Sequence, residues 1–387
     1  MMMIKIIFWG LLLIIAYSYI GYAFILMIIH LFQQKHTTTP AIDLPAVTLL
    51  IAAYNEKDVL EAKMANSASL DYPREKLVHL WITDGSTDGS EKLLMQNNNI
   101  TVLHNPERLG KIGAINRGMQ YVTTPIVVFS DANSMLAPQA IREIVPYFTN
   151  PSTGCVAGEK RIVKFQSGNA VSAGEGLYWN YESHIKKLES DINSTIGAVG
   201  ELYAIRTELF EEVAPDTILD DFVISLQIAQ KGYKIKYTPN AFATETSSMN
   251  ITEELKRKVR IGAGSLQALI RMKSLLNIFK FKMLSFQYWS HKVIRWTVVP
   301  FAMLMLLITN IDLVLNTQIY VYKAFAVFQF IFYVMAIIGW IFRNLKLRFR
   351  IIFAPYYMIT MNYALVVGMI RYLKGFQSVN WEKAKRF

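Results

Sequence analysis

Four long apolar stretches bracket the chain and constrain its fold more than any other feature. The first covers residues 6–31 without a formal charge, and the others cover 296–315, 324–342 and 351–372. A helix needs roughly 20 mostly apolar residues to cross a bilayer. The first stretch is also too long for the core of a signal peptide. We therefore expect a membrane protein with one transmembrane helix in 1–35 and three in 296–373.

Composition supports the membrane assignment. Hydrophobic residues make up 53% of the chain, and the formal net charge is +11. A positive charge of this size also occurs in nucleic-acid-binding proteins. Basic loops on the cytoplasmic side of a membrane protein explain the same charge more simply, so we expect no nucleic acid as a partner.

Basic residues predict how the chain crosses the membrane. Arg343, Lys346, Arg348 and Arg350 lie between the third and fourth stretches, which favours a cytoplasmic position for that link. Residues 33–295 are then cytoplasmic as well. The basic tail, 374–387, would lie outside, against the same rule. The alternative is that one C-terminal segment lies in the membrane interface instead of crossing.

The region between the first two stretches has the pattern of an α/β domain. Short apolar runs at 47–54, 78–83 and 126–130 alternate with helical patterns, as in a βαβ-type sheet. We place this domain at 36–270. The following segment, 271–295, mixes aromatic and cationic residues and predicts an interfacial amphipathic helix.

Acidic residues follow the predicted strands. Glu56, Asp84 and Asp131 each come directly after an apolar run, and the pair Asp220 and Asp221 lies further along. Ligands of open α/β sheets bind beyond the carboxyl ends of the strands. Carboxylates grouped there suit a metal ion, a ribose and a base that removes a proton. Because Cys155 is the only cysteine, a disulfide within the chain is excluded.

The text around these residues resembles membrane-bound family 2 glycosyltransferases, the type that builds polysaccharides and glycolipids. Each match is short, but six of them occur in the family's order. They cover residues 52–56, 84–88, 110–118, 130–133, 197–206 and 219–222. The resemblance implies a GT-A-like, Rossmann-like domain with a mixed sheet, located at the cytoplasmic face of the inner membrane in a multi-pass protein.

The resemblance also implies how the donor binds. Glu56 and Asp84 correspond to nucleotide-binding positions, and Lys111 would neutralise the diphosphate. Arg257 and Arg260 would do the same from a basic segment after the sheet. The alternatives are an acid favoured by a helix N-terminus for Glu56, an Asp-Gly turn for Asp84, and a face toward anionic headgroups for the arginines.

Asp131 corresponds to the family's metal-binding position, so Mg²⁺ or Mn²⁺ is the expected cofactor. These ions prefer carboxylate oxygens and also bind substrate phosphates. The family's second aspartate is replaced by Asn133, whose amide oxygen is a weaker, neutral ligand. Asn133 is alternatively a turn residue.

Asp221 corresponds to the general base, which takes the proton of the acceptor hydroxyl during inverting transfer. Asp220 would orient Asp221 or raise its pKa by like-charge repulsion. Both aspartates also suit the N-terminus of the following helix. Tyr178 and Trp179 are candidates for stacking an acceptor sugar, although core packing explains them equally well.

The expected function is therefore inverting transfer of a sugar from a nucleotide donor, a UDP-sugar, to a glycan or lipid-linked acceptor. One alternative is a processive polysaccharide synthase that also translocates its polymer. In the place of the processive Gln-x-x-Arg-Trp motif, only Arg260 matches, which favours short products. A non-catalytic sugar-nucleotide sensor is a further alternative. Membrane lipids, a second copy of the chain and other envelope-assembly proteins are the expected partners.

Overall fold

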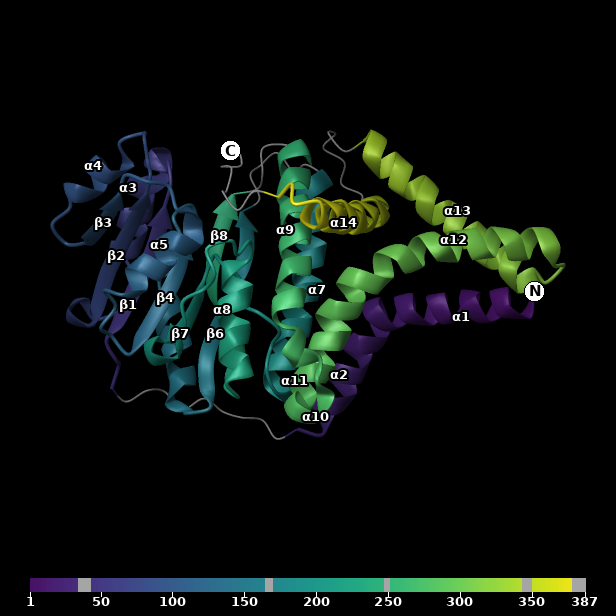
Figure 1. Ribbon diagram of the computed structural model, residues 1–387, viewed down its shortest axis with the longest axis horizontal. Coiled ribbons are helices and arrows are strands. Elements are labelled where there is room, and N and C mark those ends of the chain that lie inside the picture. The colour runs from purple at the N-terminus through teal and green to yellow at the C-terminus, as the bar shows by residue number, and fades with distance from the viewer. Residues whose placement is uncertain (34–42, 164–169, 247–250, 343–349, 378–387) are drawn as a thin grey trace.

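The computed structural model describes residues 1–33, 43–163, 170–246, 251–342 and 350–377. The β-sheet with its covering helices occupies one end of the molecule (Figure 1). Long helices extend from the other end, and the helices α7 (Ala170–Ile192) and α9 (Ile251–Arg271) lie between the two parts. Most of the predicted basic tail, from residue 378 onward, lies outside the described residues.

The first half of the sheet is parallel. Its strands are β1 (Val47–Ala53), β2 (Leu77–Asp84), β3 (Thr101–Asn105) and β4 (Ile126–Asp131), in the order β3-β2-β1-β4. The apolar runs of β1 and β4 are almost fully buried, as expected for strands covered on both faces. The connecting helices are α3 (Lys57–Ala68), α4 (Ser90–Met95) and α5 (Gly110–Met119).

The second half makes the sheet mixed. It contains β5 (Met135–Leu136), β6 (Thr153–Val163), β7 (Tyr203–Arg206) and β8 (Lys234–Thr246), and the order continues β4-β7-β6-β8-β5. β7 pairs antiparallel with β4, and β6 pairs parallel with β8. The helix α6 (Ala140–Ile144), the turns η3 (Val145–Thr149) and η4 (Thr207–Leu209), and the helix α8 (Asp220–Gln230) complete this half. The predicted mixed α/β sheet is confirmed.

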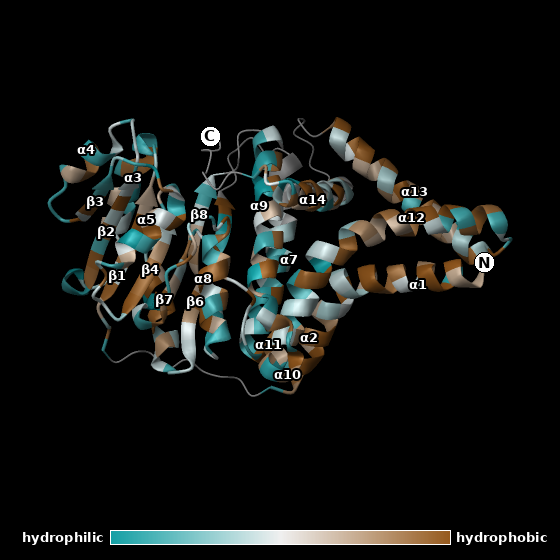
Figure 2. Ribbon diagram, in the orientation of Figure 1, coloured by the Kyte–Doolittle hydropathy of each residue, from teal (hydrophilic) through white to brown (hydrophobic). Residues whose placement is uncertain are grey.

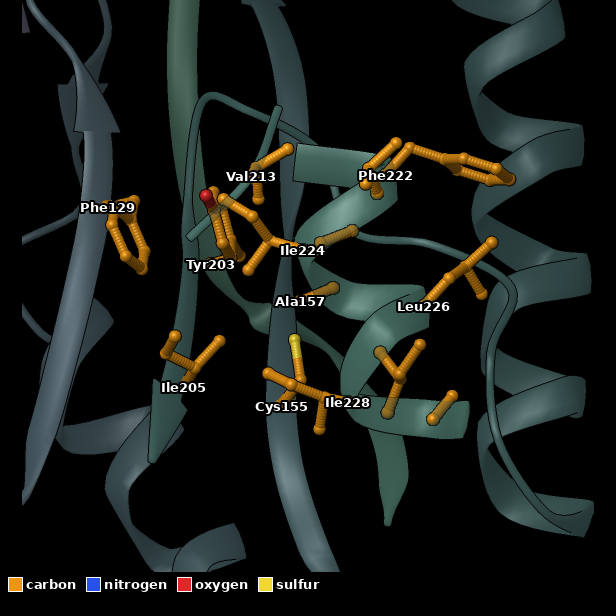
Figure 3. Packing of buried hydrophobic residues seen from close by; sticks show 14 of the residues in the cluster. Phe129, Cys155, Ala157, Tyr203, Ile205, Val213, Phe222, Ile224, Leu226 and Ile228 are labelled. Atoms are coloured by element: carbon orange, nitrogen blue, oxygen red, sulfur yellow. The ribbon is translucent and has the colours of Figure 1, made fainter. Parts of the chain in front are cut away.

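A buried apolar cluster joins the two halves of the sheet to α8 (Figure 3). Phe129 on β4 stacks on Tyr203 on β7, with ring centroids 4.6 Å apart. The single cysteine, Cys155, is fully buried in the same cluster. Strands β4 and β7, which carry site residues at their ends, are therefore fixed to each other by side-chain packing as well as by backbone hydrogen bonds.

Within the described residues, four helices are long and apolar enough to cross a membrane, and they lie toward both ends of the chain. The candidate spans are Met2–Leu31, Met283–Asn316, Tyr320–Ile341 and Phe353–Leu373. The first consists of α1 (Met2–Ala16), the π-helical turn η1 (Tyr17–Gly21) and α2 (Tyr22–Leu31). Hydrophobic residues dominate α1, α12 (Val299–Asn316) and α13 (Tyr320–Ile341) in Figure 2.

The segment 271–295, expected as one amphipathic helix, is divided into short pieces. They are η5 (Lys273–Leu276), α10 (Ile278–Phe281), α11 (Met283–Tyr288) and the π-helix η6 (Trp289–Val298). The Asn277 side chain caps α10 through the backbone N–H groups of Phe279 and Lys280. Lys282 has a φ of +48°, which ends α10. The cap at Asn277 and the positive φ of Lys282 therefore interrupt the segment that was expected to form one continuous helix.

A buried ion cluster connects the sheet domain with the membrane helices. Glu182 on α7 pairs with His291, Lys292 and Arg295 on η6, at distances of 3.0, 2.6 and 3.2 Å. Burial raises the Glu182 pKa, but Lys292, His291 and Arg295 outweigh it and lower the pKa well below its usual value. Glu189 adds a second carboxylate, 2.8 Å from His291 Nδ1, so the buried acidic and basic groups of this cluster have partners, as buried charges require.

Candidate active site

A pocket lies beyond the carboxyl ends of β1, β2 and β4, where the sequence predicted it. Four predicted site residues line it together, namely Glu56, Asp84, Lys111 and Asp131. Each comes from a different segment: the turn after β1, the end of β2, the start of α5 and the end of β4. The parallel register of these strands brings the four side chains to one edge of the sheet.

Lys111 forms the electrostatic centre of the pocket. Its Nζ lies 2.8 Å from Asp131 Oδ1 and 3.2 Å from Asp220 Oδ2. Burial lowers the Lys111 pKa, but the nearby Asp131, Asp220 and Asp221 outweigh it and raise the pKa above its ordinary value. A charged ammonium group therefore bridges Asp131 at the end of β4 and the acid pair of α8.

A second depression adjoins the pocket, and Gly200 forms part of its wall together with Lys111, Asp131 and Asp220. A Cβ atom at Gly200 would lie 3.1 Å from Lys111 Nζ, 3.6 Å from Asp221 Oδ2 and 3.7 Å from Asp131 Oδ2. The absence of a side chain therefore leaves room between a cation and two carboxylates. A group held there would touch all three side chains.

Asp220 and Asp221 occupy the first turn of α8, whose N-cap is Leu219. The helix dipole favours acids at this position, so the structural interpretation holds, while the role of Asp221 as a base stays a prediction. Removal of the carboxyl group from water raises the Asp221 pKa to about 7, with further contributions from Asp220 and Glu201, while Lys111 opposes the shift. Such a carboxylate can accept a proton near neutral pH.

The turn after β4 offers oxygen atoms to a divalent cation. Asp131 Oδ2 borders the open space at Gly200. The buried Oδ1 of Asn133 has no hydrogen-bond partner among the described residues. No group of three His, Cys, Asp or Glu side chains in the described part of the chain could hold an ion alone. The donor set therefore fits Mg²⁺ or Mn²⁺ that also binds substrate phosphate.

Asp84 has a local partner that the sequence did not reveal. Its two carboxylate oxygens accept hydrogen bonds from the backbone N–H groups of Leu109 and Gly110, at 3.1 and 2.7 Å. These residues directly precede Lys111. Asp84 therefore anchors the start of α5, while lone pairs on the same oxygens still face the pocket it lines. Glu56 is also buried, at the N-terminal boundary of α3.

The two arginines of α9 take different positions. Arg260 approaches the acid pair, and its guanidinium donates to the Ile218 carbonyl at 3.4 Å. Burial lowers its pKa, whereas Asp220, Asp221 and Asp131 act in the opposite direction. Arg257 instead pairs with Glu254 on its own helix, at 3.0 Å. Neither Arg257 nor Arg260 lines either described depression.

The predicted acceptor residues also separate. Tyr178 lies at the junction with the membrane helices, where its ring centroid is 5.4 Å from Arg295 and 5.9 Å from the Tyr357 ring. Trp179 lies nearer the sheet, 5.7 Å from Lys160 Nζ, which pairs with Glu201 beside Gly200. Neither aromatic residue lines the described depressions, so their acceptor role stays a prediction.

Two pocket residues were missed from the sequence. Arg108 lies over the Tyr54 ring, 3.8 Å from its centroid, and both residues line the pocket. A planar ring and a planar cation at the pocket wall suit a nucleobase. Tyr54 directly precedes Asn55 at the end of an apolar run, which was a usable signal. Arg108 lies in a polar turn, and its contact depends on the fold.

Comparison with known proteins agrees with this geometry. Residues 45–264, more than half of the chain, match the family model described as "Glycosyltransferase like family 2". The chain belongs to glycosyltransferase family 2. The matched region contains every site residue discussed above, from Tyr54 to Arg260, while the four candidate spans found in the described residues all lie outside it.

Relatives of this family 2 glycosyltransferase include bacterial synthases. A poly-β-1,6-N-acetyl-D-glucosamine synthase of Staphylococcus aureus (strain MSSA476) is 27% identical over 241 residues, covering 59% of this chain. The match spans 57% of the length of that synthase. The synthase of the same name from Staphylococcus epidermidis is 24% identical over 306 residues, covering 76% of this chain and 72% of its own length.

The fold is similar to that of a solved mannosyltransferase. The mannosyltransferase PcManGT from Pyrobaculum calidifontis, solved with GDP-Man and Mn²⁺, superposes with a TM-score of 0.72. The likeness covers 97% of this chain and 100% of that one, at 19% sequence identity. This family 2 glycosyltransferase therefore has the GT-A fold, with membrane-length helices at both ends, as the sequence predicted.

Proposed function

We propose that the protein transfers a sugar, with inversion, from a nucleotide-sugar donor to an acceptor at the membrane face. The observation that carries the proposal is the arrangement around Gly200. Polar atoms of Lys111, Asp131 and Asp221, from three separate elements, lie within 3.7 Å of the position that a Cβ atom of Gly200 would take, beside the pocket lined by Glu56 and Asp84. Structural packing alone does not require a cation and two carboxylates around a bare glycine.

Donor binding follows from the pocket residues. Tyr54 and Arg108 offer surfaces to the base, and Glu56 and Asp84 accept hydrogen bonds from base or ribose groups. Lys111 and Arg260 place positive charge where the diphosphate would lie. Asp131, with Asn133, would hold Mg²⁺ or Mn²⁺, which supplies Lewis-acid stabilisation of the departing diphosphate when bound. When diphosphate oxygens approach Lys111, they replace part of its pairing with the carboxylates.

Asp221 acts as the general base in this proposal. Its pKa near 7 leaves a substantial unprotonated fraction at neutral pH while keeping the carboxylate basic enough to accept a proton. The acceptor hydroxyl approaches from the side of α8, loses its proton to Asp221 and attacks the anomeric carbon. The sugar–phosphate bond breaks on the opposite face, and the nucleoside diphosphate leaves with the electron pair.

The donor in this proposal is a UDP-sugar, and the acceptor is a glycan or a lipid-linked sugar on the cytoplasmic side. Candidate spans on both sides of the family-matched region support an acceptor held at the membrane. The staphylococcal relatives are named for a β-1,6-linked N-acetylglucosamine polymer, which supports N-acetylglucosamine as the first sugar to test.

A processive synthase is the second candidate, because the staphylococcal relatives are named as synthases of a polymer. Helix α9, which occupies the place of the processive motif, argues against long products. Arg260 approaches the acid pair, but Ile261 follows it where the processive motif has tryptophan, and Ile261 offers no flat surface for a sugar. We therefore propose one or a few transfers per encounter as the primary reading.

Purified protein in lipid, incubated with a panel of radiolabelled nucleotide sugars, tests both candidates. Donor hydrolysis or transfer that depends on Asp221 and on Mg²⁺ or Mn²⁺ supports the transferase. Product sizes at large acceptor excess then separate the candidates: uniformly short products support the first, and long polymers beside untouched acceptor support the second. No turnover with any donor, despite measurable donor binding, would favour a non-catalytic sensor.

A further inference from the structure

Glu189 on α7 lies where two helices from the candidate spans meet the sheet domain. Its side chain is fully buried. One carboxylate oxygen, Oε1, accepts a hydrogen bond from the Tyr22 hydroxyl at 2.6 Å and lies 2.8 Å from His291 Nδ1. Tyr22 begins α2 in the first candidate span, and His291 belongs to η6 in the second. The backbone carbonyl of Glu189 also accepts a hydrogen bond from the Gln287 side chain at 3.1 Å. One residue of α7 is therefore bonded to both spans.

The other carboxylate oxygen of Glu189 faces a loop of the candidate site. This loop, residues 193–202, connects α7 with β7 and contains Gly200; we call it the Gly200 loop. Oε2 accepts hydrogen bonds from the Thr195 hydroxyl at 3.3 Å and from the backbone N–H of Ile196 at 3.2 Å. The two oxygens of one carboxylate thus serve opposite sides, the spans on one and the loop on the other.

Further along, the Gly200 loop is tied to the helix that carries Asp221. The backbone N–H of Ala198 donates to Ser225 Oγ at 3.0 Å, and this hydroxyl donates to the Asp221 backbone carbonyl at 2.8 Å. Between the two attachments, Gly197 has a φ of +84°, and a Cβ atom there would lie 2.2 Å from the Phe222 ring. The loop is therefore held by α7 at one end and by α8 at the other, with almost no space between.

The π-helix η6 reaches the same place through a second contact. The ring centroids of Trp296 and Phe222 are 5.4 Å apart. Phe222 directly follows Asp221, and its ring points away from the sheet in Figure 3. This contact does not involve Glu189. The packing of η6 against the domain therefore bears both on the Gly200 loop and on the first turn of α8.

A carboxylate is the group that suits this position. It only accepts hydrogen bonds when ionised, so both of its oxygens can serve donors at once. Glu189 meets donors from Tyr22, Thr195 and Ile196. An aliphatic side chain of similar length would offer no acceptor to any of them. A buried donor that loses its acceptor is unfavourable, so the loop would have to move to find another.

We infer that Glu189 is a positioning residue for the acceptor side of the site, through which the packing of the two spans sets the place of the Gly200 loop. The inference rests on the proposed function, in which the acceptor hydroxyl approaches between Gly200 and Asp221. Glu56 and Asp84 of the donor pocket lie on other elements, at the ends of β1 and β2. Loss of the Glu189 bonds should therefore impair transfer to the acceptor and leave donor binding intact.

Three variants and a matched control test the inference in the full chain, in lipid nanodiscs. Glu189→Met keeps the length of the side chain and removes both acceptor oxygens. Glu189→Gln keeps one oxygen, which can still accept from the Ile196 N–H, and should rescue part of the loss. Tyr22→Phe removes only the hydroxyl on the side of the spans. Asp191→Asn is the control, because it changes a half-buried acid of the same helix that pairs with Lys187 at 2.6 Å.

Hydrogen exchange followed by mass spectrometry measures the loop without any substrate. Peptides covering 193–202 should exchange faster in Glu189→Met, and in the same direction but less in Glu189→Gln and Tyr22→Phe. Peptides covering 47–56 and 77–84 should stay unchanged, as should all peptides of Asp191→Asn. Unchanged exchange of 193–202 overturns the inference, and so does a uniform increase across the sheet domain, which would show a purely structural role. If Glu189→Met does not fold, Tyr22→Phe decides.

Kinetics then shows whether the link serves the reaction. Calorimetry with UDP and Mn²⁺ should give unchanged donor-site affinity. With UDP-N-acetylglucosamine as donor probe and a short N-acetylglucosamine oligomer as acceptor probe, the ratio of transfer to donor hydrolysis should fall in Glu189→Met. The fall should reach up to roughly 100-fold, since a misplacement of about 1 Å can cost that much.

Equal losses of transfer and hydrolysis in Glu189→Met, or a matching loss of UDP affinity, overturn the positioning role on the acceptor side. Failure of the proposed function has a different result: the wild type then turns over neither these probes nor any other donor of the panel. The exchange of 193–202 still decides the link between Glu189 and the loop in that case.

Discussion

Lys63 Nζ lies 2.8 Å from Ser130 Oγ and also donates to the Ser134 carbonyl, so one buried ammonium group holds both ends of the turn that carries Asp131 and Asn133. Lys63 is on α3, and its side chain is fully buried. Burial lowers its pKa to about 7, with Asp131 acting in the opposite direction. The geometry of the proposed metal-binding turn therefore depends on a residue that does not line the pocket.

Lys63→Met should loosen this turn while keeping the volume of the side chain. Loss of a supporting partner of a metal ligand typically costs about 10- to 100-fold in metal affinity. We therefore expect a higher Mn²⁺ concentration for half-maximal turnover, and a smaller effect at saturating Mn²⁺. Lys76→Met, which removes an exposed pair with Asp43, is the control. An unchanged Mn²⁺ titration in folded Lys63→Met would refute the positioning role.

Gly200→Ala should abolish most turnover by filling the space between Lys111, Asp131 and Asp221. The added Cβ lies 3.1 Å from Lys111 Nζ, so the lysine must shift and the reacting groups lose their room. Gly176→Ala on α7 is the matched control, because its Cβ would meet no atom within 4 Å. Turnover and thermal stability are measured for both. Wild-type turnover in Gly200→Ala would place the reaction elsewhere.

Asp221→Asn removes the proposed base while keeping the shape of the side chain. We expect turnover to fall by roughly 10²–10⁴-fold, the usual effect of losing a general base, with donor affinity largely kept. Asp216→Asn, which changes an exposed acid paired with Arg271, should leave turnover unchanged. Single-turnover kinetics and calorimetric donor binding separate the two effects. Near-normal turnover would remove Asp221 from the mechanism.

The raised Asp221 pKa predicts how activity depends on pH. The base is active when deprotonated, so kcat/KM should rise with pH through about 7. Asp220→Asn removes the negative charge that helps to raise this pKa. The protonated form of Asp221 is then less favoured, and the rise should move to lower pH. If the pH profile of the variant superposes on the wild-type profile, the rise of kcat/KM with pH is caused by another titrating group.

The sequence predicted which acidic residues meet in the pocket because strands and their ends follow local rules. The apolar runs before Glu56, Asp84 and Asp131 identified buried parallel strands, and parallel strands bring their carboxyl ends together. Lys63 gave no signal, because its partners Ser130 and Ser134 are 67 and 71 residues away. The sequence identified Gly200 only as part of the match at 197–206. Its importance lies in the missing side chain, which no sequence pattern indicates.

The membrane-proximal segments were harder to predict for a different reason. Hydropathy reports the length and apolarity of a helix, but not its tertiary contacts. The contact of Asn362 with Tyr19, for example, joins residues 343 positions apart. The division of 271–295 depends on the cap at Asn277 and the left-handed Lys282, and periodicity does not reveal either one.

The buried ion cluster between Glu182 and the π-helix has a consequence for how the molecule comes apart. Separating the sheet domain from the membrane helices would leave Glu182 facing away from His291, Lys292 and Arg295, with buried charges on both surfaces. Breaking such a cluster is strongly unfavourable. The sheet domain and the membrane helices are therefore expected to unfold as one cooperative unit. A detergent that disturbs the helices should then also inactivate the site in the sheet domain.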